Sequence, residues 1–279
     1  WFSGFHKDLA TTVWVGTDDF SSLGKDEYGS TISLPIWLNY MDFKLKSLDV
    51  SSLAEVTGNP RIGPCVNKVG KFLCIGLNFS DHAAETGAEV PSEPITFMKA
   101  TSCINGPNDD IEIVSGSKKL DWEVELGIVI GKHTKHISEA QSQDHILGYC
   151  LVNDISEREW QIEKMGQWVK GKSHDTYGPI GPYLVTKDEI ADINNLKMSL
   201  DVNGQRMQTG NTNTMIFDVN IIVSYLSKFM SLQPGDIITT GTPPGVGMGM
   251  KPQQFLKAGD TMKLSIENLG EQNSKVVAL

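Results

Sequence analysis

The amino-acid sequence predicts a β-dominated mixed α/β fold, and three observations support this prediction. Short apolar runs bounded by Gly, Pro, Asn or Asp recur along the chain, few segments have helical periodicity, and Asn203-Gly204 is typical of a hairpin turn. With 279 residues, the chain is long enough to bury a sizeable core. The strand-like runs are residues 72–75, 95–98, 111–114, 123–130, 147–152, 183–185, 198–202, 237–240 and 262–266.

A turn-rich segment interrupts the chain at Gly58-Asn59-Pro60-Arg61-Ile62-Gly63-Pro64. The pattern before this segment is mixed, whereas the strand-like runs follow one another closely after it. We therefore expect a small N-terminal domain over residues 1–66 and a larger domain over residues 67–279.

Three segments predict helices outside the sheets. Residues 217–230 carry apolar side chains at helical spacing and stop before Pro234-Gly235. The polar stretch over residues 156–165 predicts a short helix. Ser80 is expected to cap a single helical turn over residues 80–86, because a serine hydroxyl can accept a hydrogen bond from an exposed backbone N–H group.

The charge and the cysteines limit the classes of partner and compartment. The formal net charge of −10 argues against nucleic acid and anionic membrane surfaces as partners. The four cysteines are widely spaced with no CxxC pair, so we expect buried thiols in a reducing compartment. The sequence has neither a secretory leader pattern nor an apolar stretch approaching the roughly 18 residues of a membrane span. These features predict a cytoplasmic protein.

Two glutamates in one apolar run are the strongest sign of chemistry. On a strand, Glu123 and Glu125 would point to the same face, because they are two residues apart. Two buried carboxylates on one face repel each other, and a bound cation relieves that repulsion. Asp154, after the run 147–152, adds a third oxygen ligand, which favours a hard cation such as Mg²⁺ or Mn²⁺ over Zn²⁺. An exposed edge strand with solvated acids would show the same pattern.

Six motifs follow one another along the chain in a specific order. They are Gly76-Leu77-Asn78-Phe79-Ser80-Asp81-His82-Ala83-Ala84-Glu85, Phe97-Met98-Lys99, Asp121-Trp122-Glu123-Val124-Glu125-Leu126, Asn153-Asp154-Ile155-Ser156-Glu157-Arg158, Gly171-Lys172-Ser173-His174-Asp175-Thr176 and Gly241-Thr242-Pro243-Pro244-Gly245-Val246-Gly247. Together and in this order they resemble the fumarylacetoacetate hydrolase family. The resemblance covers about residues 55–279 and is nearest to bacterial 2,4-diketo-3-deoxy sugar-acid (rhamnonate or fuconate) hydrolases and to proteins labelled ureidoglycolate lyase. It implies a β-roll of packed sheets, a catalytic domain over residues 67–279 and a homodimer.

The resemblance also implies roles for nine residues. The residues that match the family's metal ligands, which hold Mg²⁺ or Mn²⁺, are Glu123, Glu125 and Asp154. The residues that match its catalytic positions are His82, Glu85 and Lys172, and those that match its substrate-binding positions are Arg158, Gln161 and Thr242.

The residue types suit these roles, although each also has an ordinary structural interpretation. His82 and Glu85 are three apart, so one helical turn would let the carboxylate orient an imidazole that activates water. Lys172 could stabilise an oxyanion. Without the resemblance, the favoured interpretation of the histidine and glutamate is a surface pair. For the lysine it is a solvated side chain, and for Thr242 it is a plain Pro-Gly turn.

Together these residues predict a metal-dependent hydrolase that acts on a 2-oxo acid. It would cleave a carbon–carbon bond of a 2,4-diketo acid, an acylpyruvate or a 2,4-diketo-3-deoxy sugar acid, to pyruvate and a carboxylic acid. Oxaloacetate decarboxylation, ureidoglycolate cleavage and isomerisation of unsaturated 2-oxo acids fit the same site. A non-catalytic metal-binding or ligand-sensing protein is a further alternative, and it would bind a 2-oxo acid without turnover.

Overall fold

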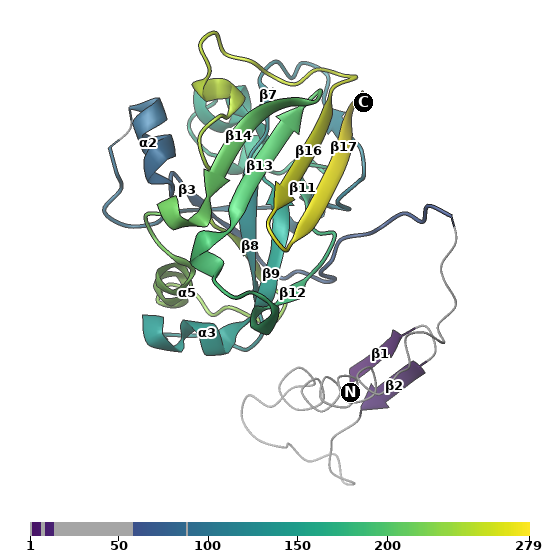
Figure 1. Ribbon diagram of the computed structural model, residues 1–279, viewed down its shortest axis with the longest axis vertical. Helices are drawn as coiled ribbons and strands as arrows, with labels where there is room; N and C mark the ends of the chain where they lie inside the picture. The colour runs from purple at the N-terminus through teal and green to yellow at the C-terminus, as the bar shows by residue number, and fades with distance from the viewer. Residues whose placement is uncertain (1, 7–8, 14–57, 88) are drawn as a thin grey trace. The chain divides into compact units, whose positions relative to one another are not determined.

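A computed structural model gives the fold (Figure 1) and describes residues 2–6, 9–13, 58–87 and 89–279. The chain divides into two units, residues 1–60 and 61–279. In the first unit the described residues form one antiparallel pair, β1 (Phe2–His6) with β2 (Leu9–Val13). The N-terminal domain predicted over residues 1–66 lies mostly outside the described residues, so its boundary stays a prediction.

One sheet of the larger unit has six strands. β8 runs antiparallel to β9 and β15, whereas β15 runs parallel to β3, so the sheet is mixed. All seven residues of β8 are buried, which explains its nearly continuous apolar sequence. The strand predicted over residues 183–185 is observed as β12, which starts at Val185 and is only two residues long. The order across the sheet is β12 (Val185–Thr186), β9 (Ile146–Asn153), β8 (Val124–Ile130), β15 (Ile237–Thr239), β3 (Phe72–Gly76) and β4 (Ile95–Lys99).

The other sheet has five strands and contains the predicted hairpin. Asn203 and Gly204 join β13 to β14 with φ angles of 52° and 76°, the positive values that a tight hairpin turn of this type requires. β14 and β17 escaped prediction because their sequences are largely polar; β17 alternates between buried and exposed positions along most of its length. The order is β14 (Gln205–Asn211), β13 (Lys197–Val202), β16 (Thr261–Ile266), β17 (Gly270–Ala278) and β6 (Ile111–Ile113).

The main core lies between the two sheets. Figure 1 shows β13, β14, β16 and β17 side by side in front of β8 and β9. Leu126 and Leu151 of the six-stranded sheet share one buried apolar cluster with Leu200 and Leu264 of the five-stranded sheet. The prediction of a strand-rich mixed α/β fold is therefore confirmed.

The helix α5 (Val219–Ser227) packs against this core, but it is shorter than the predicted range of 217–230. The Asp218 carboxylate accepts hydrogen bonds from the backbone N–H groups of Asn220 and Ile221, at 2.8 and 3.0 Å. This N-cap explains why the helix begins at Val219.

The helix α2 (Ser80–Thr86) is present as predicted and ends at Gly87, whose φ is 68°. The prediction that Ser80 caps it is wrong. Phe79 occupies the N-cap position without a side-chain hydrogen bond, and the Ser80 hydroxyl donates instead to the carbonyl of Thr214 at 3.2 Å.

The helix predicted over residues 156–165 is wrong in its first part. β10 (Ser156–Glu157) pairs antiparallel with β7 (Leu120–Asp121), and only a single π-helical turn, Glu159–Glu163, follows. The pairing prevails because it satisfies the backbone polar groups of two buried segments beside the carboxylates.

Short elements complete the larger unit. They are β5 (Ile104–Asn105), which pairs in parallel with β11 (Gly178–Pro179), the helices α3 (Ser142–His145) and α4 (Val169–Lys172), and 3-10 turns at Thr101–Cys103, Glu139–Gln141, Lys187–Glu189, Ile193–Asn195, Thr212–Thr214 and Gly247–Gly249.

All four cysteines are free thiols, with Cys65 half-buried and the other three buried. In the part of the chain that the structure describes, no helix is long and apolar enough to cross a membrane.

Candidate metal centre and active site

The pairing of β8 with β9 brings three carboxylates together. Glu125 pairs with Val152 in the ladder, and the backbone N–H of Asp154 donates to the carbonyl of Glu123 at 2.9 Å. One carboxylate oxygen from each of Glu123, Glu125 and Asp154 lies within 4.8 Å of the others, and all three residues are buried. The strand begins at Val124, so Glu123 lies just before it rather than inside it.

Two buried lysines balance part of this negative charge. The Nζ of Lys172 donates to Glu123 Oε2 at 2.6 Å and to Asp154 Oδ2 at 2.7 Å. The Nζ of Lys99 donates to Asp154 Oδ1 at 2.5 Å and to the carbonyl of Ile155 at 3.2 Å. Burial by itself lowers the pKa of Lys172, but the Asp154 and Glu123 carboxylates raise it above its ordinary value, so the ammonium stays charged.

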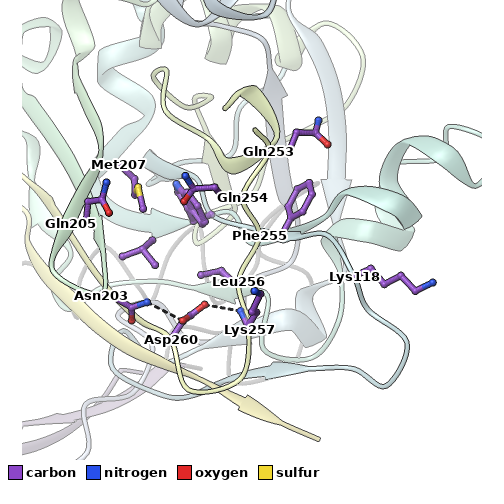
Figure 2. A pocket seen from close by; sticks show the side chains of 12 residues that line it. Lys118, Asn203, Gln205, Met207, Gln253, Gln254, Phe255, Leu256, Lys257 and Asp260 are labelled. Carbon is purple, nitrogen blue, oxygen red and sulfur yellow. Dashed lines mark hydrogen bonds between the residues drawn. The ribbon is translucent and has the colours of Figure 1, made fainter. Parts of the chain in front are cut away.

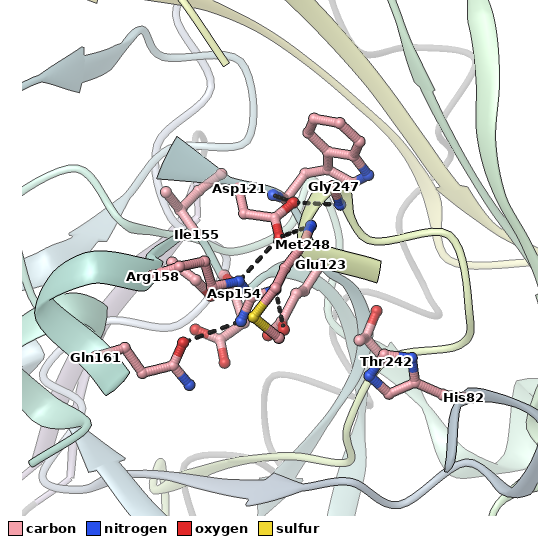
Figure 3. Close-up of polar contacts among 12 residues, drawn as sticks. His82, Asp121, Glu123, Asp154, Ile155, Arg158, Gln161, Thr242, Gly247 and Met248 are labelled. Carbon is pink, nitrogen blue, oxygen red and sulfur yellow. Dashed lines mark hydrogen bonds and ion pairs between the residues drawn. The ribbon is translucent and has the colours of Figure 1, made fainter. Parts of the chain in front are cut away.

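The Arg158 guanidinium makes three side-chain hydrogen bonds around the same cluster (Figure 3). Its Nε donates to Asp121 Oδ2 at 2.8 Å, its Nη2 to Glu123 Oε1 at 2.8 Å, and its Nη1 to Gln161 Oε1 at 3.0 Å. Arg158 and Gln161 therefore contact each other directly. The planar guanidinium fixes the orientation of the Glu123 carboxylate.

Asp121 joins this cluster to the loop that follows β15. Besides Arg158, its carboxylate accepts hydrogen bonds from the backbone N–H groups of Trp122, Gly247 and Met248, at 2.9, 2.7 and 3.0 Å. A fully buried carboxylate with four donors is well satisfied, so Asp121 serves as a structural anchor of the loop.

The Glu123 and Glu125 carboxylates differ in their charge environment. Burial raises the pKa of Glu123, but Lys172 and Arg158 outweigh burial and hold it well below its ordinary range. Burial, followed by the negative charges of Asp154 and Glu123, raises the pKa of Glu125 well above its ordinary range. Within the described part of the chain, no lysine or arginine lies at ion-pair distance from Glu125.

A metal cation fits this arrangement. The carboxylates of Asp121 and of the three acidic residues outnumber by one the cations paired with them, which are Lys99, Arg158 and Lys172. The unbalanced carboxylate, Glu125, accepts a hydrogen bond from the backbone N–H of Gly241 at 3.0 Å. A cation bound among these oxygen ligands would relieve both the repulsion and the cost of burying that charge. The cluster can therefore hold a metal ion, as the sequence pattern predicts.

A cavity of about 300 Å³ opens beside the acidic cluster. Seven of the nine predicted site residues line it. The other two, Asp154 and Glu85, lie outside the lining. Asp154 is fully buried and bonds to the lining residue Lys172, and Glu85 contacts the lining residue His82. The seven predicted residues in the lining are His82, Glu123, Glu125, Arg158, Gln161, Lys172 and Thr242.

His82 and Glu85 form a pair on α2, as their spacing predicts. Nδ1 of His82 lies 3.1 Å from Oε2 of Glu85. The Glu85 carboxylate also accepts a hydrogen bond from the backbone N–H of Gly245, at 3.0 Å from Oε1. Glu85 therefore orients the imidazole and fastens α2 to the loop after β15 at the same time.

Thr242 lines the cavity, but its hydroxyl already has protein partners. It donates to the carbonyl of Val124 at 3.0 Å and accepts a hydrogen bond from Nε2 of Gln208 at 2.8 Å. Oε1 of Gln208 in turn accepts the backbone N–H of Val124 at 3.0 Å. These bonds tie the loop after β15 to β8, and a substrate-binding role for Thr242 stays a prediction.

Sequence reasoning assigned no role to Lys99. The available signal was the alternation of β4, which places Ile95, Phe97 and Lys99 on one face of the strand. Ile95 and Phe97 line the cavity, and the Lys99 ammonium reaches the acidic cluster beyond them.

Replacing Lys99 with methionine tests the energetic weight of its ion pair. We expect Lys99→Met to lower the free energy of unfolding of the metal-free protein by about 3 kcal/mol, because the buried Asp154 carboxylate loses one of its ammonium partners. Urea denaturation measures this loss. The matched control is Lys263→Met, which removes an exposed ion pair with Glu271 and should cost about 0.5 kcal/mol or less. Equal losses in the two variants would contradict the prediction.

A second cavity, of about 480 Å³, lies beside the β13–β14 hairpin (Figure 2). Asp260 is the acidic residue in its lining, and this carboxylate accepts hydrogen bonds from Nδ2 of Asn203 at 2.9 Å and from the backbone N–H of Lys257 at 2.7 Å. Among the described residues, no group of carboxylates meets there. The smaller cavity is therefore the candidate active site.

Known proteins are similar to this chain in sequence and in fold. A "Putative hydrolase" of Burkholderia cenocepacia (strain HI2424) is 60% identical over 230 residues, which is 82% of each chain. The fumarylacetoacetate hydrolase of Exiguobacterium antarcticum, whose structure is solved, is 35% identical, with a TM-score of 0.76 over 84% of each chain. The 2-hydroxyhepta-2,4-diene-1,7-dioate isomerase of Mycobacterium marinum is 37% identical, with a TM-score of 0.68 over 77% of each chain.

The match to a family profile covers most of the larger unit. The profile described as "Fumarylacetoacetate (FAA) hydrolase C-terminal" matches residues 71–277. This range contains the six-stranded sheet, the five-stranded sheet except Ala278 at the end of β17, and every residue of the acidic cluster and its cavity. The chain therefore belongs to the fumarylacetoacetate hydrolase family.

Proposed function

We propose that this enzyme is a Mg²⁺- or Mn²⁺-dependent hydrolase that cleaves the C3–C4 bond of a 2,4-diketo acid of the acylpyruvate type. The observation that carries the proposal is that His82, oriented by Glu85, lines the same cavity as the acidic pair Glu123 and Glu125. Hydrolysis of such a bond needs a base that activates water and a group that stabilises negative charge at the 2-oxo end. The name of the Burkholderia relative also supports hydrolysis.

The residues in and around the cavity have different roles in the proposed reaction. Glu123, Glu125 and Asp154 would hold the ion, which supplies Lewis acidity toward the 2-oxo acid. His82 accepts a proton at Nε2 from a water molecule that attacks C4, while Glu85 holds the ring through Nδ1. The C3–C4 bond then breaks, its electron pair stays on C3, and protonation of C3 gives pyruvate beside the carboxylic acid.

The cationic side chains suit the anionic end of such a substrate. Lys172 places a charged ammonium in the cavity lining. Arg158 and Gln161 line the cavity beside it, and we assign them to the substrate carboxylate, which a guanidinium and an amide can both bind. Because Arg158 also contacts Glu123, binding of the substrate and orientation of the acidic cluster are coupled.

The second candidate function is isomerisation of an unsaturated 2-oxo acid. It is favoured by the likeness to the Mycobacterium marinum isomerase. An isomerase moves a proton between carbon atoms of one molecule, so it releases no pyruvate and needs no attacking water. Product analysis therefore separates the two candidates.

Acetylpyruvate with Mg²⁺ provides the direct test. We expect its enol absorbance to fall with the formation of one pyruvate and one acetate per substrate, and a chelator should stop the reaction. Metal-dependent binding without pyruvate release would contradict hydrolysis. In that case an unsaturated 2-oxo acid and oxaloacetate, assayed in parallel, would test isomerisation and decarboxylation.

We also propose that the enzyme is a homodimer, which the family resemblance implies. Light scattering coupled to size-exclusion chromatography measures the mass in solution. A mass near twice the 30.6 kDa of one chain is the expected result, and a mass near 30.6 kDa would contradict it.

A further inference from the structure

One wall of the active-site cavity is apolar. Ile95 and Phe97 of β4 line it with Trp168, which directly precedes α4, and both Ile95 and Trp168 lie against Gly76 of β3. The rings of Phe97 and Trp168 meet edge to face, with their centroids 5.1 Å apart and their planes at 65°. In a cavity of about 300 Å³, a group that enters beside these side chains exchanges contacts with water for contacts with apolar surface.

This wall has a fixed position next to the catalytic groups. A Cβ atom at Gly76 would lie 2.7 Å from Cζ3 of Trp168, so the glycine allows the indole to lie directly on the backbone of β3. On its other side, the Phe97 ring lies 5.1 Å from Nζ of Lys172. The apolar wall therefore starts where the anionic end of the substrate would be bound and extends away from it.

Among the residues that the structure describes, the cavity lining offers no further positive charge for a second anionic group. Arg158 and Lys172 are the lysine and arginine side chains in this lining. Both contact buried carboxylates, and the proposed function already uses them for the anionic 2-oxo acid end of the substrate. His82, the other basic lining residue, contacts Glu85. A carboxylate or hydroxyl placed against the apolar wall would lose water without gaining a partner, which costs free energy.

We propose that the enzyme selects 2,4-diketo acids whose acyl group beyond C4 is a short apolar chain. Ile95, Phe97 and Trp168 set this preference. The inference rests on the proposed function and narrows it. It places substrates with a second carboxylate, and the hydroxylated acyl groups of 2,4-diketo-3-deoxy sugar acids, below alkyl acylpyruvates of equal length.

Matched substrate pairs test the preference. In the first pair, 2,4-dioxoheptanoate and 2,4-dioxoheptanedioate differ by a terminal methyl group against a carboxylate. In the second, 2,4-dioxohexanoate and 5-hydroxy-2,4-dioxohexanoate differ by one hydroxyl. We expect kcat/KM to favour the alkyl member by about 10²-fold in the first pair and about tenfold in the second. Equal values, or higher values for the dioate or the hydroxy acid, would overturn the proposal.

A binding measurement separates this proposal from hydrolysis. 2-Oxoheptanoate and 2-oxoheptanedioate lack the C4 carbonyl and cannot be cleaved, so calorimetric titration with Mg²⁺ present reports the cavity alone. Tighter binding of the monoacid by about tenfold or more supports the apolar wall even if no acylpyruvate is hydrolysed. Equal or tighter binding of the diacid overturns the wall's role even if hydrolysis is observed.

Two arginine variants on opposite faces of β4 locate the determinant. Ile95 is 38% exposed at the cavity, whereas Met98, 44% exposed, lies on the other face of the same strand. Ile95→Arg should raise kcat/KM for the heptanedioate relative to the heptanoate by about tenfold, because it supplies the missing cation. Met98→Arg should leave the ratio unchanged. Equal shifts in both variants, or none with Ile95→Arg, would contradict the assignment of the wall.

Discussion

The Glu125→Gln variant is expected to lose metal binding and turnover, and to be more stable than the wild-type protein when both are metal-free. Glutamine keeps the shape of the side chain and its bond to the Gly241 N–H, but it removes a buried charge that forms no ion pair with any described lysine or arginine. A substitution that abolishes function but raises the free energy of unfolding indicates that the charge serves ligand binding rather than stability.

The pH dependence of the unfolding free energy provides a second test of the Glu125 charge. The pKa of Glu125 is raised in the folded protein, so the folded state binds this proton more tightly than the unfolded state does. The unfolding free energy of the metal-free wild type should therefore fall as pH rises from the ordinary glutamate value of about 4.3 toward the raised pKa. Glu125→Gln lacks this group, so its stability should exceed that of the wild type increasingly over that interval.

Calorimetric titration with Mn²⁺ and urea denaturation in chelator measure the two effects. We expect metal affinity to fall by about 10²-fold or more, since loss of groups that merely orient ligands already costs up to about that much. Glu271→Gln is the matched control, because its carboxylate is exposed and pairs with Lys263 at the surface. Unchanged metal affinity in Glu125→Gln would remove the acidic cluster as the metal site.

Local pattern predicted the parts of the fold in which one signal dominates. The apolar run of β8, the Asn203-Gly204 turn and the amphipathic α5 all follow from residues close together in sequence. Sequence reasoning failed where a distant segment decides the outcome. Residues 156–157 have a helix-compatible sequence, but they pair with β7 because that segment lies beside them in the fold. β17 was missed because its polar outward-facing positions hide its alternation.

The candidate site shows the same division. The spacing of Glu123 and Glu125 predicts a shared face without knowledge of the fold, and Asp154 follows from the apolar run before it. The partners of these carboxylates come from other parts of the chain, so spacing could not reveal that Lys99 bonds Asp154 from β4. Nor could it show that the hydroxyl of Thr242 is already bonded within the protein.

The His82→Asn variant is expected to lower kcat for acetylpyruvate by about 10² to 10⁴-fold, because a general base contributes about that much to a rate. Metal affinity should stay near the wild-type value, since His82 lies on α2 and not in the acidic cluster. Single-turnover kinetics and calorimetric titration measure the two quantities. The matched control is His133→Asn, an exposed histidine outside the cavity lining, which should keep wild-type kcat.

The same variant separates the proposed hydrolysis from the alternative of oxaloacetate decarboxylation. Attack of water on C4 needs a base, whereas decarboxylation of oxaloacetate at the same metal centre loses CO₂ without an attacking water. If the wild type decarboxylates oxaloacetate at all, His82→Asn should impair that activity far less than acylpyruvate cleavage. Equal loss of both would mean that His82 acts in substrate binding rather than in activation of water. In that case Glu85, which holds both His82 and the Gly245 backbone, would be the residue to replace next.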